Sequence, residues 1–189
     1  MPVKEESFIN TSKMIVKLKP LQSVMVDTSR SCLALDRKYY MKIWIDADAC
    51  PKIVKEVIFK ASFRLRIPVC LVANSYMAVP QGGLVSSIQV DKGADVADFY
   101  IVENVTEGEL VITADIPLAS LVVEKGAIAI NPRGEPYTEE NISERLSMRD
   151  FMQGLRDSGV DTGGPAPFGP KDKEHFANSL NRILTQMMK

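Results

Sequence analysis

Histidine and cysteine are scarce in this chain of 189 residues, which contains one histidine, His175, and three cysteines, Cys32, Cys50 and Cys70. One histidine cannot form a multi-histidine metal site, and the cysteine spacing matches no structural zinc site. An odd number of cysteines also argues against a disulfide-stabilised secreted protein. We therefore expect a cytoplasmic protein whose site is built from other residue types.

Several functional motifs are also absent. The chain has no Gly-x-Ser-x-Gly nucleophile elbow, and its glycines form neither a Walker loop nor a dinucleotide-binding fingerprint. No apolar run approaches the roughly 20 residues that span a membrane, so we expect no membrane partner. The formal net charge is −1, which means that nucleic acid would have to be attracted by a local basic face.

The first forty residues differ in pattern from the rest of the chain. Residues 1–40 show no sustained hydrophobic period, whereas an apolar strand pattern starts directly after Met41. We predict that residues 1–40 are a poorly ordered N-terminal extension and that residues 41–189 form a single domain. A marginal hairpin of the segments IVKL and SVMV is the alternative for the extension.

Strand and helix patterns alternate from Met41 onwards. Strands are predicted at 42–46, 69–73, 85–90, 109–113 and 127–130. Helices are predicted at 51–66, 94–105, 116–125, 139–157 and 171–188. This alternation predicts an α/β fold with three α/β/α layers, a central, mainly parallel five-stranded sheet and additional C-terminal helices.

Acidic residues follow two of the apolar strands and begin one of the helices. Parallel strands of a sheet deliver their carboxyl ends into one crevice, so these side chains are expected to meet there. Their mutual repulsion favours a cation between them, and oxygen ligands suit Mg²⁺ or Mn²⁺. The predicted metal ligands are Asp46, Asp48, Asp95, Asp98 and Asp115. Helix capping and interaction with helix dipoles are the alternative role for each of these acids.

A second group of residues is predicted to bind the substrate. Guanidinium groups suit phosphate recognition, and the glycine-rich segment TGGPAPFGP is predicted to lie near the acidic crevice with exposed backbone amides. The candidates are Asn74, Arg133, Arg145, Arg149, Gly163 and Gly164. Ion pairs with Glu144 or Asp150 remain the alternative for the arginines, as does a plain interhelix linker for the glycines.

Seven motifs between Met41 and nearly Lys189 together resemble the YaiI/YqxD family of uncharacterised bacterial proteins. They are MKIWIDADACP, VANS, GADVAD, LVITADIPLA, NPRG, RLSMRDFMQGLR and TGGPAPF. The family looks like a branch of the PIN/NYN-type nuclease superfamily. The resemblance therefore implies a PIN-like domain with an acidic, Mg²⁺-dependent site that cuts RNA.

The resemblance also implies roles for individual acids. Asp46 matches the first-strand aspartate of such nucleases, Asp98 and Asp95 match their helix acids, and Asp115 matches the acid after the fourth strand. Asp48 stands where many relatives have a less uniform polar residue.

Three functions are compatible with these residues. The first is a metal-dependent nuclease in which Asp46, Asp98 and Asp115 are catalytic and RNA is the expected partner. The second is a binding or regulatory module that uses the same crevice without turnover. The third is a haloacid-dehalogenase-type phosphatase, because Asp46 and Asp48 resemble its acid pair, although Cys50 stands where that motif has Thr or Val. The oligomeric state is left open.

Overall fold

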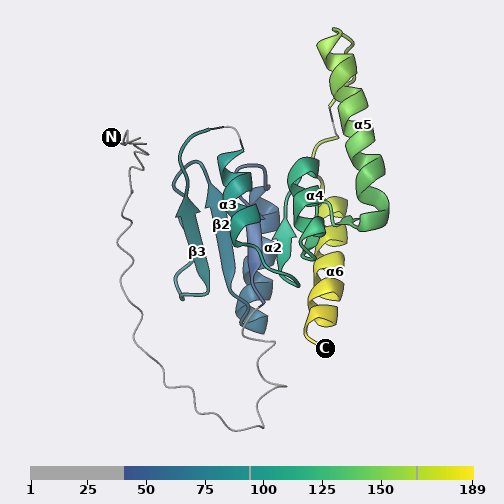
Figure 1. Ribbon diagram of the computed structural model, residues 1–189. Helices are drawn as coiled ribbons and strands as arrows, with labels where there is room; N and C mark the ends of the chain where they lie inside the picture. Colours follow the sequence, from purple (N-terminus) through teal and green to yellow (C-terminus); the bar gives the residue numbers. More distant parts are fainter. Residues whose placement is uncertain (1–40, 94, 165) are drawn as a thin grey trace, which may run out of the picture. The chain divides into compact units, whose positions relative to one another are not determined.

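The computed structural model describes residues 41–93, 95–164 and 166–189. The predicted N-terminal extension and its alternative hairpin lie outside the described residues. The strands in chain order are β1 Ile43–Asp46, β2 Val69–Ala73, β3 Val85–Gln89, β4 Leu110–Ile112, β5 Ile128–Ile130 and β6 Pro136–Tyr137. The helices are α2 Lys52–Leu65, α3 Val96–Asn104, α4 Ile116–Glu124, α5 Glu139–Asp157 and α6 Pro170–Met187 (Figure 1).

The six strands form one sheet in the order β3-β2-β1-β4-β5-β6, and the first five are parallel. The chain adds β2 and β3 on one side of β1 and then crosses back to place β4 on the other side. The direction of strand addition therefore reverses between β1 and β4. Open α/β sheets bind ligands beside the carboxyl ends of their strands at such a reversal.

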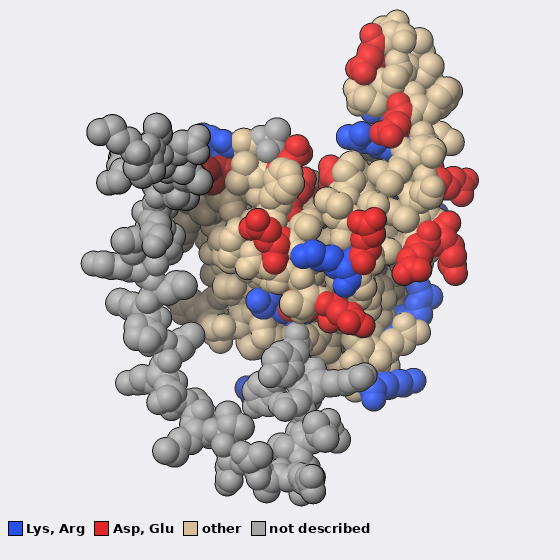
Figure 2. Space-filling model, in the orientation of Figure 1, with Lys and Arg blue, Asp and Glu red and all other residues tan. Residues whose placement is uncertain are grey.

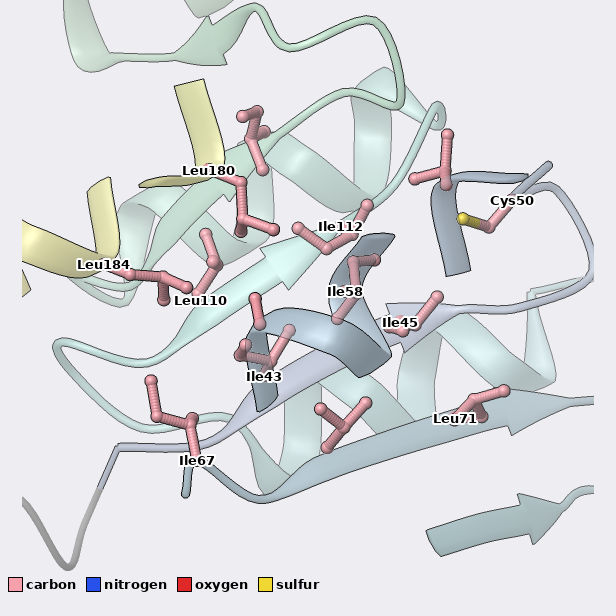
Figure 3. Close-up of a cluster of buried hydrophobic side chains, with 14 of the residues drawn as sticks. Ile43, Ile45, Cys50, Ile58, Ile67, Leu71, Leu110, Ile112, Leu180 and Leu184 are labelled. Carbon is pink, nitrogen blue, oxygen red and sulfur yellow. The ribbon is translucent and has the colours of Figure 1, made fainter. Parts of the chain in front are cut away.

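Apolar side chains on both faces of β1 connect the three layers. Ile43 and Ile45 belong to a buried cluster that includes residues of α2 and α6 (Figure 3). Trp44, between them in sequence, belongs to a second cluster with residues of α3 and α4. A strand buried on both faces needs a continuous apolar run, which is the pattern that predicted it. The predicted three-layer α/β/α fold is confirmed.

The short strand β6 was not predicted, because the last strand pattern in the sequence ends at residue 130. Residues 131–134 reverse the chain, and β6 pairs antiparallel with β5. The Asn131 side-chain oxygen accepts hydrogen bonds from the backbone N–H groups of Arg133 and Glu135 at 2.9 and 3.0 Å. An asparagine that binds the backbone two residues ahead stabilises a turn in this way.

Among the described residues, no helix combines the length and the apolar character needed to cross a bilayer.

Replacing Gly134 by alanine tests the packing of the Asn131–Gly134 turn on α6. Gly134 has φ +90°, and a Cβ there would lie 2.8 Å from the Phe176 Cα atom. Gly159 has a similar φ of +81°, but a Cβ there would meet nothing within 4 Å. We expect Gly134→Ala to lower the free energy of unfolding by about 2 kcal/mol more than Gly159→Ala, because only Gly134→Ala adds a backbone clash to the strain. Urea unfolding of both variants measures the difference, and equal losses would contradict this packing.

Candidate functional site

A cavity of about 340 Å³ opens at the carboxyl end of the sheet, beside the reversal between β1 and β4. Figure 2 shows acidic side chains gathered around the hollow between α3 and α4, below the projecting end of α5. The residues that line the cavity are Asp46, Asp48, Ala49, Asn74, Gly93, Asp95, Ala97, Asp98, Ala114 and Asp115. The structure thus brings all five predicted acids together with Asn74.

A larger cavity of about 500 Å³ lies at the opposite end of the strands, beside Met41, Gly108 and Ile128. Glu107 is the one carboxylate side chain among its described lining residues. A single acid provides neither a ligand set nor an acid–base pair. The acidic cavity is therefore the stronger candidate for chemistry.

Asp46 is the last residue of β1 and is only 7% exposed. Burial raises the pKa of its carboxyl group, and repulsion from Asp115 and Asp48 raises it further. Hydrogen bonds from the Thr113 hydroxyl and from the backbone of Ala49 act in the opposite direction and lower this pKa. These hydrogen bonds therefore stabilise the charged form of the Asp46 carboxylate, and a bound cation would stabilise it further.

Thr113 links the ends of β1 and β4, and sequence analysis missed it. Its side chain is fully buried, its Oγ1 donates to Asp46 Oδ2 at 3.0 Å, and the same Oγ1 accepts from the Asp115 backbone N–H at 2.9 Å. One hydroxyl therefore fixes the carboxylate of one strand end and the backbone at the other. A polar residue that closes the apolar run LVIT was the available signal.

Asp115 and Asp48 each use one carboxylate oxygen within the fold. Asp115 caps α4, because its Oδ1 accepts from the Leu118 backbone N–H at 2.8 Å. Asp48 Oδ2 accepts from the Asn74 backbone N–H at 2.7 Å, which ties the loop after β1 to the end of β2. Capping is therefore a role of Asp115, and the same residue lines the cavity.

Asp98 and Asp95 lie at the start of α3. The pKa of Asp98 is raised from 3.8 to about 6, first by burial and then by repulsion from Asp115, Asp46 and Asp95. Asp95 precedes the helix with a left-handed backbone, φ 60°, and its side chain makes no capping hydrogen bond. Aspartate tolerates this conformation better than most residues. The side chain of Asp95 is thus left facing the cavity rather than holding the helix end.

Asn74 adds a neutral oxygen to the cavity wall. Its Oδ1 atom is buried and has no hydrogen-bond partner among the residues that the structure describes. An unpartnered buried carbonyl oxygen is costly, and a cation or a donor group of a ligand would satisfy it.

The donor set of the cavity fits a hydrated Mg²⁺ or Mn²⁺ ion. Every candidate ligand is a carboxylate or amide oxygen, which is the chemistry that these hard cations select. Across residues 41–93, 95–164 and 166–189, no three His, Cys, Asp or Glu side chains lie close enough to hold one ion directly. Mg²⁺ commonly keeps several water ligands and takes only one or two carboxylates from the protein, so a wider spacing suits it.

Of the three predicted substrate-binding arginines, Arg149 is attracted by acids of the cavity. It forms an ion pair with Asp150 at 2.8 Å. Its pKa is raised first by this hydrogen bond, and attraction from Asp115 and Asp95 contributes further. Arg149, on α5, therefore lies near two of the acids that line the cavity.

Arg133 and Arg145 are engaged in contacts within the fold. Arg133 pairs with Asp172 at 2.8 Å and also donates to the backbone oxygen of Ala166. Arg145 pairs with Glu135 at 3.1 Å, and its guanidinium group lies 5.3 Å from the centre of the Tyr137 ring.

Gly163 and Gly164, the first two glycines of the TGGPAPFGP segment, are not among the described residues that line the acidic cavity. Gly163 N–H donates to the side chain of Asp161 at 2.9 Å, which turns the segment on itself.

Comparison with known proteins identifies the relatives of this chain. The family model described as "Uncharacterized BCR, YaiI/YqxD family" matches residues 44–186. This chain is 60% identical to the UPF0178 protein of Trichlorobacter lovleyi over 149 residues, which are 79% of this chain and 97% of that protein. It is 56% identical over 149 residues to the UPF0178 protein of Shewanella amazonensis and covers all of it.

The UPF0178 protein of Citrifermentans bemidjiense is likewise 56% identical over 149 residues, which are 97% of its length. No solved structure matches the chain. Because the family model spans most of the chain, and these relatives are matched over nearly their whole length at more than half identity, the chain belongs to the YaiI/YqxD family.

Proposed function

We propose that the protein is a metal-dependent nuclease that hydrolyses phosphodiester bonds, with RNA as the expected substrate. The observation that carries this proposal is the convergence of Asp46, Asp98 and Asp115 on one cavity at the reversal between β1 and β4. Burial raises the pKa of both Asp46 and Asp98, and repulsion from Asp115 raises both further. A cluster of carboxylates of this kind destabilises the metal-free protein. Such clusters are expected where a protein binds a cation.

The same residues would hold the ion. Asp46, Asp98 and Asp115 would bind Mg²⁺ or Mn²⁺ directly or through its water ligands, and Asp48 and Asp95 would complete the surrounding shell. A bound ion of this kind activates water as a nucleophile and neutralises the charge that develops on the phosphate. The unpartnered Oδ1 atom of Asn74 offers a neutral oxygen to the ion, to one of its waters or to the substrate.

The protein's own residues would set the geometry. Thr113 holds one oxygen of Asp46, and the capping bond to Leu118 fixes one oxygen of Asp115. Arg149 would contact a phosphate, because it is exposed and lies near Asp115 and Asp95. Asp150, the ion-pair partner of Arg149, is an exposed surface residue, so a phosphate would compete effectively with it for the guanidinium group.

A phosphatase with Asp46 as nucleophile is less compatible with this arrangement. An attacking carboxylate needs an accessible, charged oxygen. Asp46 is 7% exposed, its pKa is raised by burial, and one of its oxygens is held by Thr113.

Divalent cations should raise the melting temperature of the protein, because they offset the repulsion in the folded state only. We expect millimolar Mn²⁺ or Mg²⁺ to stabilise the unaltered chain, and Asp46→Asn or Asp115→Asn to remove most of the effect. Asparagine still caps helices well, so Asp115→Asn should fold. Asp161→Asn, outside the cavity lining, should respond like the unaltered chain. Absence of Mn²⁺ binding by calorimetry would contradict the metal site.

Hydrolysis of labelled RNA and DNA, in single- and double-stranded form, tests the activity itself. We expect cleavage of RNA that requires Mg²⁺ or Mn²⁺, stops with EDTA and falls at least about 100-fold in Asp46→Asn. Asp161→Asn again serves as the control. If metal binds normally but no substrate is cleaved, the binding module replaces the nuclease, and a trapped aspartyl-phosphate would indicate the phosphatase instead.

The raised pKa of Asp98 predicts a pH-dependent effect of Asp98→Asn in metal-free buffer. The folded protein binds this proton more tightly than the unfolded chain, so stability is lost as pH rises from 3.8 to about 6. Asp98→Asn should therefore raise the free energy of unfolding by about 1 kcal/mol at pH 7, allowing for solvent screening, with the gain fading towards pH 4.

Glu103→Gln is the matched control for this measurement, because Glu103 lies on the same helix and is exposed. It should show no such pH-dependent gain. If Asp98→Asn destabilised the metal-free protein at pH 7, the repulsion inferred for the cavity would be wrong.

A further inference from the structure

Helix α2 carries a cationic face that is exposed to solvent. The charged residues of α2 and of its C-cap position are Lys52, Lys55, Glu56, Lys60, Arg64 and Arg66. All of the cations except Lys55 are exposed. Five cations and one acid give this segment a net charge of +4, whereas the whole chain carries −1. The helix therefore concentrates positive charge on a protein that has none to spare elsewhere.

The cations of α2 are not neutralised within the described part of the chain. None of them forms an ion pair with another described residue. Arg64 donates a hydrogen bond at 2.6 Å to the side-chain oxygen of Asn181, which is a neutral group on α6. Lys55 is used inside the fold, because its Nζ donates at 2.9 Å to the backbone oxygen of Ala47. The exposed cations therefore keep their charge available to a partner.

Three of the exposed cations follow one side of the helix. Lys52 and Lys60 lie about two turns apart, and Arg64 lies about one turn further along. Val54 and Ile58, on the opposite side, are buried against the sheet. At 1.5 Å per residue the two steps between the cations measure about 12 and 6 Å along the helix axis. Steps of this size allow the cations to contact different phosphates of one strand.

The cationic face begins beside the acidic cavity. Asp48 and Ala49 line the cavity, are exposed, and precede α2 by only a few residues. The hydrogen bond from Lys55 to the Ala47 oxygen ties the first turns of α2 to this same loop. α2 packs on the face of the sheet opposite to α3 and α4. A strand held at the cavity therefore reaches α2 by passing over the exposed loop at the end of β1.

An aromatic side chain lies among the cations. Phe63 is 40% exposed, and it lies about three turns after Lys52 on the same side of the helix. Aromatic rings between cations stack with the bases of single-stranded nucleic acid. Ile53, at 36%, is the other exposed large apolar side chain of α2. Two partly exposed side chains do not form the broad apolar face with which a basic helix enters a membrane surface.

We propose that α2 is the docking surface for the phosphate backbone of a single-stranded nucleic acid whose reacting bond lies in the acidic cavity. The inference rests on the proposed function, because the nuclease reaction is the reason for a nucleic acid at that cavity. Lys52, Lys60 and Arg64 contact phosphates, and Phe63 stacks on a base. The acids of the cavity repel phosphates, so cations outside it have to supply much of the affinity.

Fluorescence anisotropy of a labelled single-stranded RNA, with the full chain in EDTA, measures this binding separately from cleavage. Lys60→Gln should weaken binding several-fold and lower the slope of log K against log salt by about 0.7, the contribution of one phosphate contact. Glu56→Gln should instead tighten binding, because it removes the acid of α2. A variant that merely disturbed the helix would not bind more tightly, so the opposite signs identify an electrostatic effect.

Arg182→Gln is the matched control for Lys60→Gln. Arg182 is an exposed cation on α6, and it lies beside the residues of β6 rather than beside α2. Its replacement removes the same charge from the protein, so it should leave the affinity and the salt slope nearly unchanged. Circular dichroism verifies that each variant keeps its helices.

Substrate length separates this inference from the proposed function. If RNA is cleaved, lengthening it from a dinucleotide to about 12 nucleotides should lower KM, and Lys60→Gln should lose most of that gain. RNA that binds through α2 without being cleaved would end the nuclease proposal and leave the docking surface standing. Absence of RNA binding at low salt, binding that ignores Lys60→Gln and Glu56→Gln, an equal loss in Arg182→Gln, or binding to anionic phospholipid vesicles in place of RNA would each overturn the docking surface.

Discussion

The burial of the Asp46 carboxylate at the end of the central strand is the constraint on which the site depends. β1 is buried along its whole length, so the strand that anchors both hydrophobic layers ends on an ionisable group with little access to water. The Thr113 hydroxyl and the Ala49 backbone offset part of that desolvation. Placing Thr113 beside Asp46 in turn requires that β4 pair with β1 in the observed register, with Ile45 opposite Ile112.

The order of strands explains why further carboxylates gather at the same place. Because the chain returns to add β4 next to β1, the ends of these two strands open onto the gap between α3 and α4. Asp98 enters that gap from α3 and Asp115 from the start of α4. Each acid also has a local reason to lie near a helix N-terminus. Burial, and then repulsion from the other acids of the cavity, raises the pKa of Asp98 to about 6, which capping alone does not explain.

Much of this arrangement follows from the sequence, and the exceptions have physical causes. The two-sided burial of β1, β2 and β4 produces unbroken apolar runs, so these strands and the acids that follow β1 and β4 were predictable. β6 was missed because residues 131–134 look like a terminating turn, and the reversal shows only in the antiparallel pairing of β6 with β5. Thr113 was missed because a threonine in a strand is ordinary, and its role comes from a partner 67 residues away. The ion pairs of Arg133 and Arg145 likewise depend on tertiary neighbours.

The central claim is that a cation belongs among these carboxylates, and anomalous diffraction from crystals grown with Mn²⁺ tests it most directly. The account predicts an anomalous peak inside the acidic cavity, with an oxygen of Asp46 or Asp115 at about 2.2 Å and water in the remaining positions. Crystals with millimolar Mn²⁺ that show an empty cavity, or a peak bound only to surface carboxylates elsewhere, would contradict the account.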